Sequence, residues 1–173
     1  MKFLSDIRLL LLGVWLGSAV FFIGVAQTAF ALVADRGLAG AVVGRSLSIL
    51  NYGGLIIAVL LILTSLMIRN ASAFWLWTER LLLLIVGAAC AVGEFVIGVG
   101  MSSIRSQFGG SIDEAAADDP LKIRFGQLHH WSEWVLTAAM IAAFIAFFII
   151  ANRKFTAPKA ATNIYDFEKE FKI

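Results

Sequence analysis

The chain has 173 residues, of which 60% are hydrophobic and 15% charged, with a mean hydropathy of +0.88 and a formal net charge of +2. Soluble domains carry more charge and less apolar surface, so this composition excludes an ordinary soluble fold. The single cysteine, Cys90, excludes an intramolecular disulfide. The basic residues lie at the flanks of apolar stretches without forming a basic patch, so no nucleic-acid partner is expected.

Four apolar stretches follow one another along the chain, at residues 9–33, 46–68, 81–103 and 134–151. Each approaches or exceeds the roughly 20 residues that a helix needs to cross a bilayer core of about 30 Å. We expect helices at approximately 9–34, 39–68, 78–103 and 120–151 in one domain, 1–151, followed by a polar cytoplasmic tail, 152–173. The predicted fold is therefore all-α, an integral membrane four-helix bundle.

The distribution of lysine and arginine predicts the orientation of these helices. The first stretch is longer than the apolar segment of a signal peptide, about 7–15 residues, so it is interpreted as a transmembrane helix. With both termini inside, nine lysines and arginines lie on the inner side and five on the outer side. The positive-inside rule thus favours N-in, C-in, in a multi-pass protein of a bacterial cytoplasmic (inner) membrane.

Polar side chains lie within the first three apolar stretches and just before the fourth, at a similar distance from the outer end of each predicted helix. They are Gln27, Asn51, Glu94, His129, Ser132 and Glu133. At 1.5 Å per residue they lie roughly 8–16 Å inward from the outer charges, on helix faces rich in glycine and alanine. Because polar groups in a bilayer normally face protein or water, we expect them to converge in one cluster in the outer half of the bundle.

The chemistry of this cluster has several interpretations. Glu94 is expected to be protonated or paired with Gln27, His129 or Arg105, either as an interhelical hydrogen bond or as a proton or ion site. Arg105 is otherwise a snorkelling anchor. His129 and Glu133, spaced i,i+4, form a weak metal site with Glu94. His129 or His130 could ligate haem or chlorophyll, although the pattern predicts no particular cofactor.

Several short motifs stand out: Val14-Trp15-Leu16-Gly17, Val25-Ala26-Gln27-Thr28-Ala29-Phe30, Ala39-Gly40 with Val43-Gly44, and Phe125-x-x-Leu128-His129-x-x-Ser132. Together they resemble the transmembrane-protein-205-like family of four-helix proteins, which is mostly described as a domain of unknown function. The resemblance covers the first, second and fourth helices and implies their fold and topology. The chain departs from the family pattern at Gln27-Thr28, where Ala-Pro is common, and in having His130 beside His129.

The chain carries no phosphate-binding glycine loop, no nucleophile with a paired base and no cysteine-rich metal motif, so an enzyme is not expected. The leading hypothesis is a non-catalytic accessory or assembly subunit in the lipid bilayer, bound to a larger membrane complex or to itself. One alternative is a transporter or binder of protons, metal ions or small solutes through the outer-half cluster. The other is a haem- or chlorophyll-binding subunit.

Overall fold

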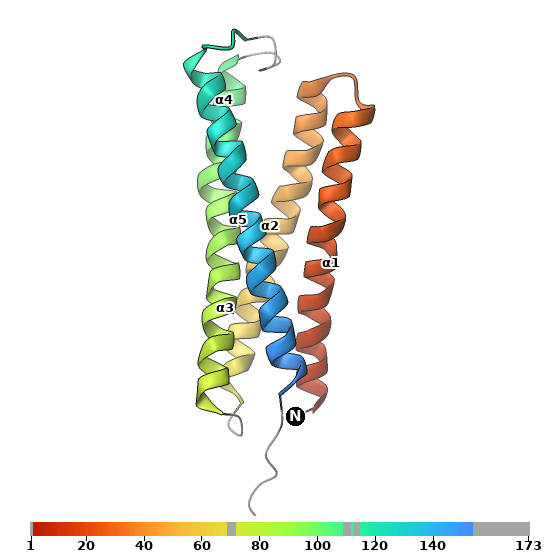
Figure 1. Ribbon diagram of the computed structural model, residues 1–173, viewed down its shortest axis with the longest axis vertical. Coiled ribbons are helices and arrows are strands. Elements are labelled where there is room, and N and C mark those ends of the chain that lie inside the picture. The colour runs from red at the N-terminus through yellow and green to blue at the C-terminus, as the bar shows by residue number, and fades with distance from the viewer. Residues whose placement is uncertain (1, 69–71, 109–111, 113–114, 154–173) are drawn as a thin grey trace, which may run out of the picture.

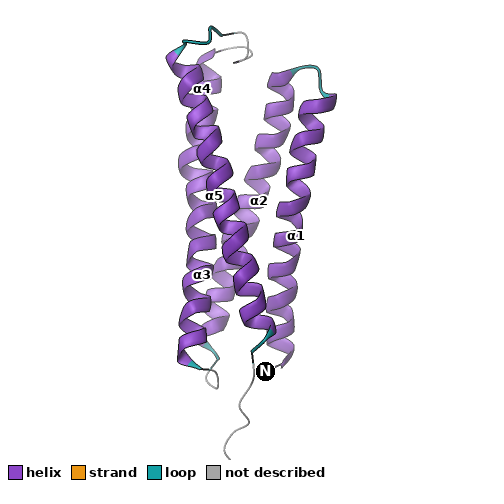
Figure 2. Cartoon of the chain, in the orientation of Figure 1, coloured by secondary structure: helices purple, strands orange, loops and turns teal. Residues whose placement is uncertain are grey.

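Each apolar stretch forms a helix longer than the stretch itself. The computed structural model describes residues 2–68, 72–108, 112 and 115–153. Its helices are α1 (Lys2–Leu32), α2 (Arg36–Leu66), α3 (Ala73–Val92), η1 (Gly93–Gly98), α4 (Val99–Phe108) and α5 (Pro120–Ala151). α3, η1 and α4 follow without a break, so the described residues form four helical spans that are long and apolar enough to cross a membrane. The all-α class is confirmed, and the described residues contain no strand (Figure 2).

The helix boundaries differ from the expected ones mainly at charged residues. α1 begins at Lys2 instead of near residue 9, and the third span runs from Ala73 to Phe108. Helical backbone satisfies its own hydrogen bonds, so it continues past the apolar stretch without cost at a membrane surface. α5 begins at Pro120, where the Asp119 carboxylate accepts the N–H of Leu121 at 2.8 Å. Apart from Asn152 and Arg153, the predicted polar tail lies outside the described residues.

The spans run roughly parallel to one another, with the start of α1 and the end of α5 at the same end (Figure 1). We call this the basal end, and the end with the α1–α2 turn the distal end. α3 packs against α2 and α5, and α1 packs against α2 and α5. Towards the distal end, α1 and α2 lie apart from α4 and α5, whereas the helices converge basally (Figure 1).

The buried core lies mostly in the basal half of the bundle. α5 contributes a face of four alanines, Ala139, Ala142, Ala143 and Ala146. α1 contributes Leu12 and Trp15 together with Ala19. Small side chains allow the helices to approach closely, as is common in membrane bundles. The Trp15 indole also donates to the carbonyl of Leu50 at 3.0 Å and joins α1 to α2. Ala19 is the last buried residue of α1, so the distal part of this helix has few neighbours.

The third span contains one wide turn. In η1 the backbone adopts π-helical geometry, and the N–H of Val99 bonds to the carbonyl of Glu94, five residues earlier. The wide turn also brings the Gly93 carbonyl within 3.2 Å of the position of a Cβ on Gly98. Glycine therefore fits at this position better than any larger residue. Single π turns within α-helices are rare and frequently occur at functional sites.

The adjacent glycines of α2 provide a test of the packing. A Cβ on Gly54 would lie 2.5 Å from both the Cys90 sulfur and the Trp15 indole nitrogen, whereas a Cβ on Gly53 would meet nothing within 4 Å. We expect Gly54→Ala to lower the free energy of unfolding by about 1–3 kcal/mol, because Trp15 must move. Gly53→Ala should be neutral or slightly stabilising, since alanine favours helix.

Thermal unfolding of the two variants in the same detergent measures this difference. Equal melting temperatures for Gly53→Ala and Gly54→Ala would contradict the close contact of α1, α2 and α3 at this point.

Candidate functional site

Two intramembrane polar residues from different helices meet directly. The Ser48 hydroxyl on α2 donates to the Glu94 carboxylate in η1 at 2.7 Å. The sequence predicts that Glu94 is protonated or paired with Gln27, His129 or Arg105, and the partner in the structure is instead Ser48. Ser48 lies three residues before Asn51 on α2, so both side chains share one face of the helix. A hydroxyl can stabilise either protonation state of Glu94, because it can both donate and accept.

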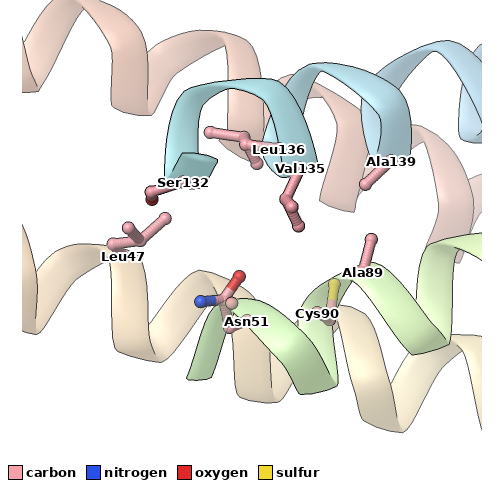
Figure 3. Close-up of a pocket in the computed structure, with 9 residues that line it drawn as sticks. Leu47, Asn51, Ala89, Cys90, Ser132, Val135, Leu136 and Ala139 are labelled. Carbon is pink, nitrogen blue, oxygen red and sulfur yellow. The ribbon is translucent and has the colours of Figure 1, made fainter. Parts of the chain in front are cut away.

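Asn51 lies beside this pair, on the same face of α2. It is buried, and its amide nitrogen lies 3.0 Å from the position that a Cβ on Gly93 would occupy. Asn51 and Ser132 both line a small pocket between α2, α3 and α5, together with Cys90 and Gly93 (Figure 3). The pocket has a volume of about 10 Å³, close to the minimum that one water molecule requires. We name Ser48, Asn51, Glu94 and Ser132 the mid-bundle polar site.

The other predicted members do not join this site. Gln27 and Glu133 are exposed, and so are His129 and His130. The expectation of a single buried cluster is therefore wrong for Gln27, His129 and Glu133, whereas His130 was not predicted to belong to it. The physical reason is the divergence of α1 and α5: a Cβ added to Gly17 or Gly24 of α1 would meet nothing within 4 Å. A shared face on each helix did not reveal how far apart the helices lie.

The two histidines of α5 interact with residues of their own helix. His130 Nε2 accepts a hydrogen bond from the Trp134 indole at 2.9 Å, and its Nδ1 lies 3.5 Å from Glu133. His129 Nε2 lies 3.5 Å from the other oxygen of Glu133. Within the described part of the chain, no three His, Cys, Asp or Glu side chains are grouped as metal ligands. The predicted combination of His129, Glu133 and Glu94 is therefore not assembled, and tetrapyrrole ligation by either histidine stays a prediction.

Arg105 crosses from α4 to α2 near the distal end. Its guanidinium nitrogens lie 3.0 Å and 3.3 Å from the Cβ positions of Gly40 and Gly44, and its central carbon lies 5.3 Å from the centre of the Phe125 ring. The glycines leave the space that the guanidinium occupies. Arg105 is thus an interhelical contact with a cation–π component, where the sequence suggested an anchor or a partner for Glu94.

The sequence analysis missed a second group of charges at the basal end. Glu79 of α3 is fully buried and contacts two arginines, Arg8 of α1 and Arg153 just after α5. Arg8 also donates to the carbonyl of Leu61 at 2.7 Å. Next to Glu79, Arg80 donates to the hydroxyl and the carbonyl of Ser65, both at 3.0 Å. We call Arg8, Glu79, Arg80 and Arg153 the basal charge cluster.

These arginines were interpreted only as flanking charges that set the orientation. The structure corrects this for Arg8 and Arg153, whose side chains are 1% and 4% exposed. Burial lowers the pKa of Arg153 to about 10, with a further contribution from the positive charge of Arg8. Both arginines, Arg8 and Arg153, still carry a positive charge at neutral pH. The signal in the sequence was Glu79, a carboxylate at the start of an apolar stretch. Every other predicted helix has basic residues at the same end of the bundle.

The basal charge cluster also gives a scale for depth in the membrane. Gln27 is 19 residues beyond Arg8, and Glu133 is 20 residues before Arg153. At 1.5 Å per residue these separations are about 28 Å and 30 Å, close to the thickness of a bilayer core. With the basal cluster at one boundary, the exposed polar residues lie near the opposite one. Glu94, about 22 Å from Glu79 along the helix, lies somewhat deeper.

Comparison with known proteins identifies one family. Residues 10–108 match the family model described as Domain of unknown function (DUF4149), which spans most of α1 and continues through α4. No curated protein matches the chain, and no solved structure does. The match does not support the transmembrane-protein-205-like family specifically.

The buried carboxylate of the basal charge cluster should be the most sensitive acidic position. Glu79→Gln leaves two buried guanidinium groups without a counter-charge, and we expect a loss of about 3–5 kcal/mol in the free energy of unfolding. The matched control is Glu133→Gln, because Glu133 is 61% exposed and such substitutions usually change stability by less than about 0.5 kcal/mol. Chemical denaturation in detergent compares the two, and similar losses would refute the assignment.

The mid-bundle polar site gives a separate expectation. Glu94→Gln should keep most of the stability, because an amide oxygen can accept the Ser48 hydroxyl. Glu94→Leu removes the acceptor and should cost about 1–3 kcal/mol. Ser48→Ala should reduce the difference between these two variants, which a double-mutant cycle measures. An unchanged difference in the Ser48→Ala background would show that the two residues are not coupled.

Proposed function

The chain belongs to the DUF4149 family, whose function is unknown, and we propose that it is a non-catalytic accessory or assembly subunit. In this proposal the distal part of α1 packs against a transmembrane helix of a larger membrane complex, or of a second copy of the chain. The proposal rests on one observation, an unpacked face of small residues on a membrane-spanning helix.

That face consists of positions spaced three or four residues apart on α1. All of them are exposed: Gly17, Val20, Gly24, Gln27 and Ala31. The opposite face of α1 packs into the bundle through Trp15 and Ala19, so the helix itself is held in place. Gly17 and Gly24 lie about 14 Å and 24 Å from Arg8 along the helix, which is within the depth of a hydrocarbon core.

A second transmembrane helix is the partner that fits this face best. Glycines at helix contacts let two backbones approach closely, which increases van der Waals contact in lipid. The Gln27 amide, near the distal boundary of the bilayer core, can also hydrogen-bond to a neighbouring helix, at about 0.6 kcal/mol on average. The face thus has the shape and the polar group that helix association uses.

The orientation that supports this proposal places the basal end in the cytoplasm. Both described chain ends lie basally (Figure 1), and most lysines and arginines belong to this end of the spans. The small-residue face of α1 then lies in the outer half of a bacterial cytoplasmic membrane, where we expect the partner helix.

The small-residue face gives a direct test. Gly24→Leu should reduce co-purification of partners from native membranes at least tenfold, equivalent to about 1.4 kcal/mol, because the larger side chain separates the two helices. It should leave the melting temperature of the isolated protein unchanged, since a Cβ on Gly24 meets nothing within 4 Å. Gly126→Leu is the control: this glycine of α5 is equally open, and its substitution should leave co-purification intact.

A differently tagged second copy in the same membranes separates the two kinds of partner. Recovery of that copy alone indicates self-association, and recovery of other membrane proteins indicates a larger complex. Co-purification that survives Gly24→Leu, or that Gly126→Leu abolishes equally, would contradict docking through α1.

A further inference from the structure

The basal charge cluster contains more positive than negative charge. The cluster has three arginines and one carboxylate: Glu79 contacts Arg8 and Arg153, and the charge of Arg80 acts on Arg8. Arg8 and Glu79 are fully buried, and the Arg153 side chain is 4% exposed. Burying a charge is costly unless a partner neutralises it, so this excess calls for an additional anion.

The hydrogen bonds of the two buried arginines are also incomplete. Arg8 uses Nη2 for Leu61 and Glu79, but its Nε and Nη1 have no acceptor among the described residues. Arg153 contacts Glu79 through Nη2, and its Nε and Nη1 likewise have no acceptor there. A buried donor without an acceptor costs the full loss of its hydration. Four guanidinium nitrogens, Nε and Nη1 of each arginine, therefore require acceptor oxygens that the described residues do not supply.

The position of the cluster indicates where these oxygens could come from. Arg8 is six residues from the start of α1, about 9 Å along the helix, and Arg153 follows the last turn of α5. At the same end, large aromatic side chains on the first turns of α3 are exposed: Phe74, Trp75 and Trp77. Aromatic residues of this kind mark the membrane–water interface, where lipid phosphates lie. The cluster is thus at the depth of a headgroup.

We propose that the basal charge cluster binds a phosphate group, with Arg8 and Arg153 as its direct ligands and Glu79 as the residue that positions both. The planar guanidinium fork matches the geometry of phosphate oxygens and favours bidentate contacts. Arg153 lies beyond the last helical residue, so its side chain can change conformation and make room for the phosphate group. The depth of the site favours the headgroup of an anionic lipid, and free phosphate has the same chemistry.

Thermal unfolding of the purified full-length protein tests the proposal. It is measured with phosphatidylcholine alone, with added phosphatidylglycerol, and with phosphatidylcholine plus inorganic phosphate. Phosphatidylglycerol should raise the melting temperature by roughly 3–10 °C, the range expected for a ligand at 10–100 times its Kd and a chain of this size. Arg153→Gln should remove most of this shift. Arg45→Gln should retain it, because Arg45 is an exposed arginine of α2 and the two variants have equal net charge.

The comparison between the additions identifies the source of the phosphate. A shift with phosphatidylglycerol alone indicates a lipid headgroup, and a similar shift with inorganic phosphate indicates a free ion. If Arg153→Gln does not fold, Arg153→Lys keeps the charge without the fork and should reduce the shift. An equal shift in the Arg153 and Arg45 variants, or no shift with either addition, would overturn the proposal. None of these outcomes tests the small-residue face of α1, which lies towards the other end of the bundle.

Discussion

One buried carboxylate holds together the basal end of the bundle. Glu79 joins the first helix to the residue that follows the last helix, through Arg8 and Arg153. Such contacts are strong only when water is excluded, and the neighbouring core of alanine and leucine side chains excludes it. The ends of α1, α3 and α5 therefore depend on one another: the apolar core makes the ion pairs effective, and the ion pairs fix where the core can form.

The helices of the distal half are held together by different contacts. There, polar contacts join α2 to the third span, with Ser48 on Glu94 and Arg105 against two glycines of α2. Few side chains are buried, and α1 diverges from α5 (Figure 1). A helix in lipid keeps its own backbone hydrogen bonds, so it can stand apart from its neighbours without unfolding. The basal half of the bundle is thus closely packed, whereas the distal half leaves one face of α1 open.

The sequence predicts the number, class and approximate extent of the helices, because the length of an apolar stretch and the bilayer thickness are sufficient for that. It also predicts that the polar side chains of Asn51 and Glu94 face inward. It does not predict the exposure of Gln27 or His129, since a glycine-rich face marks a possible contact and does not say whether the partner belongs to the same chain. The burial of Arg8 is equally hidden, because an arginine at a helix end usually faces the headgroups.

The wide turn in η1 has a consequence for the register of the third span. A π turn contains about one more residue than an α turn, so every residue beyond it is rotated by about 100° relative to an uninterrupted helix. The guanidinium of Arg105 lies seven residues beyond Gly98 and reaches Gly40 of α2. In an unbroken α-helix, a residue next to position 105 in the sequence would point towards Gly40. Arg105 would then point in another direction. The direction in which the distal side chains of this span point thus depends on a single extra residue between Gly93 and Gly98.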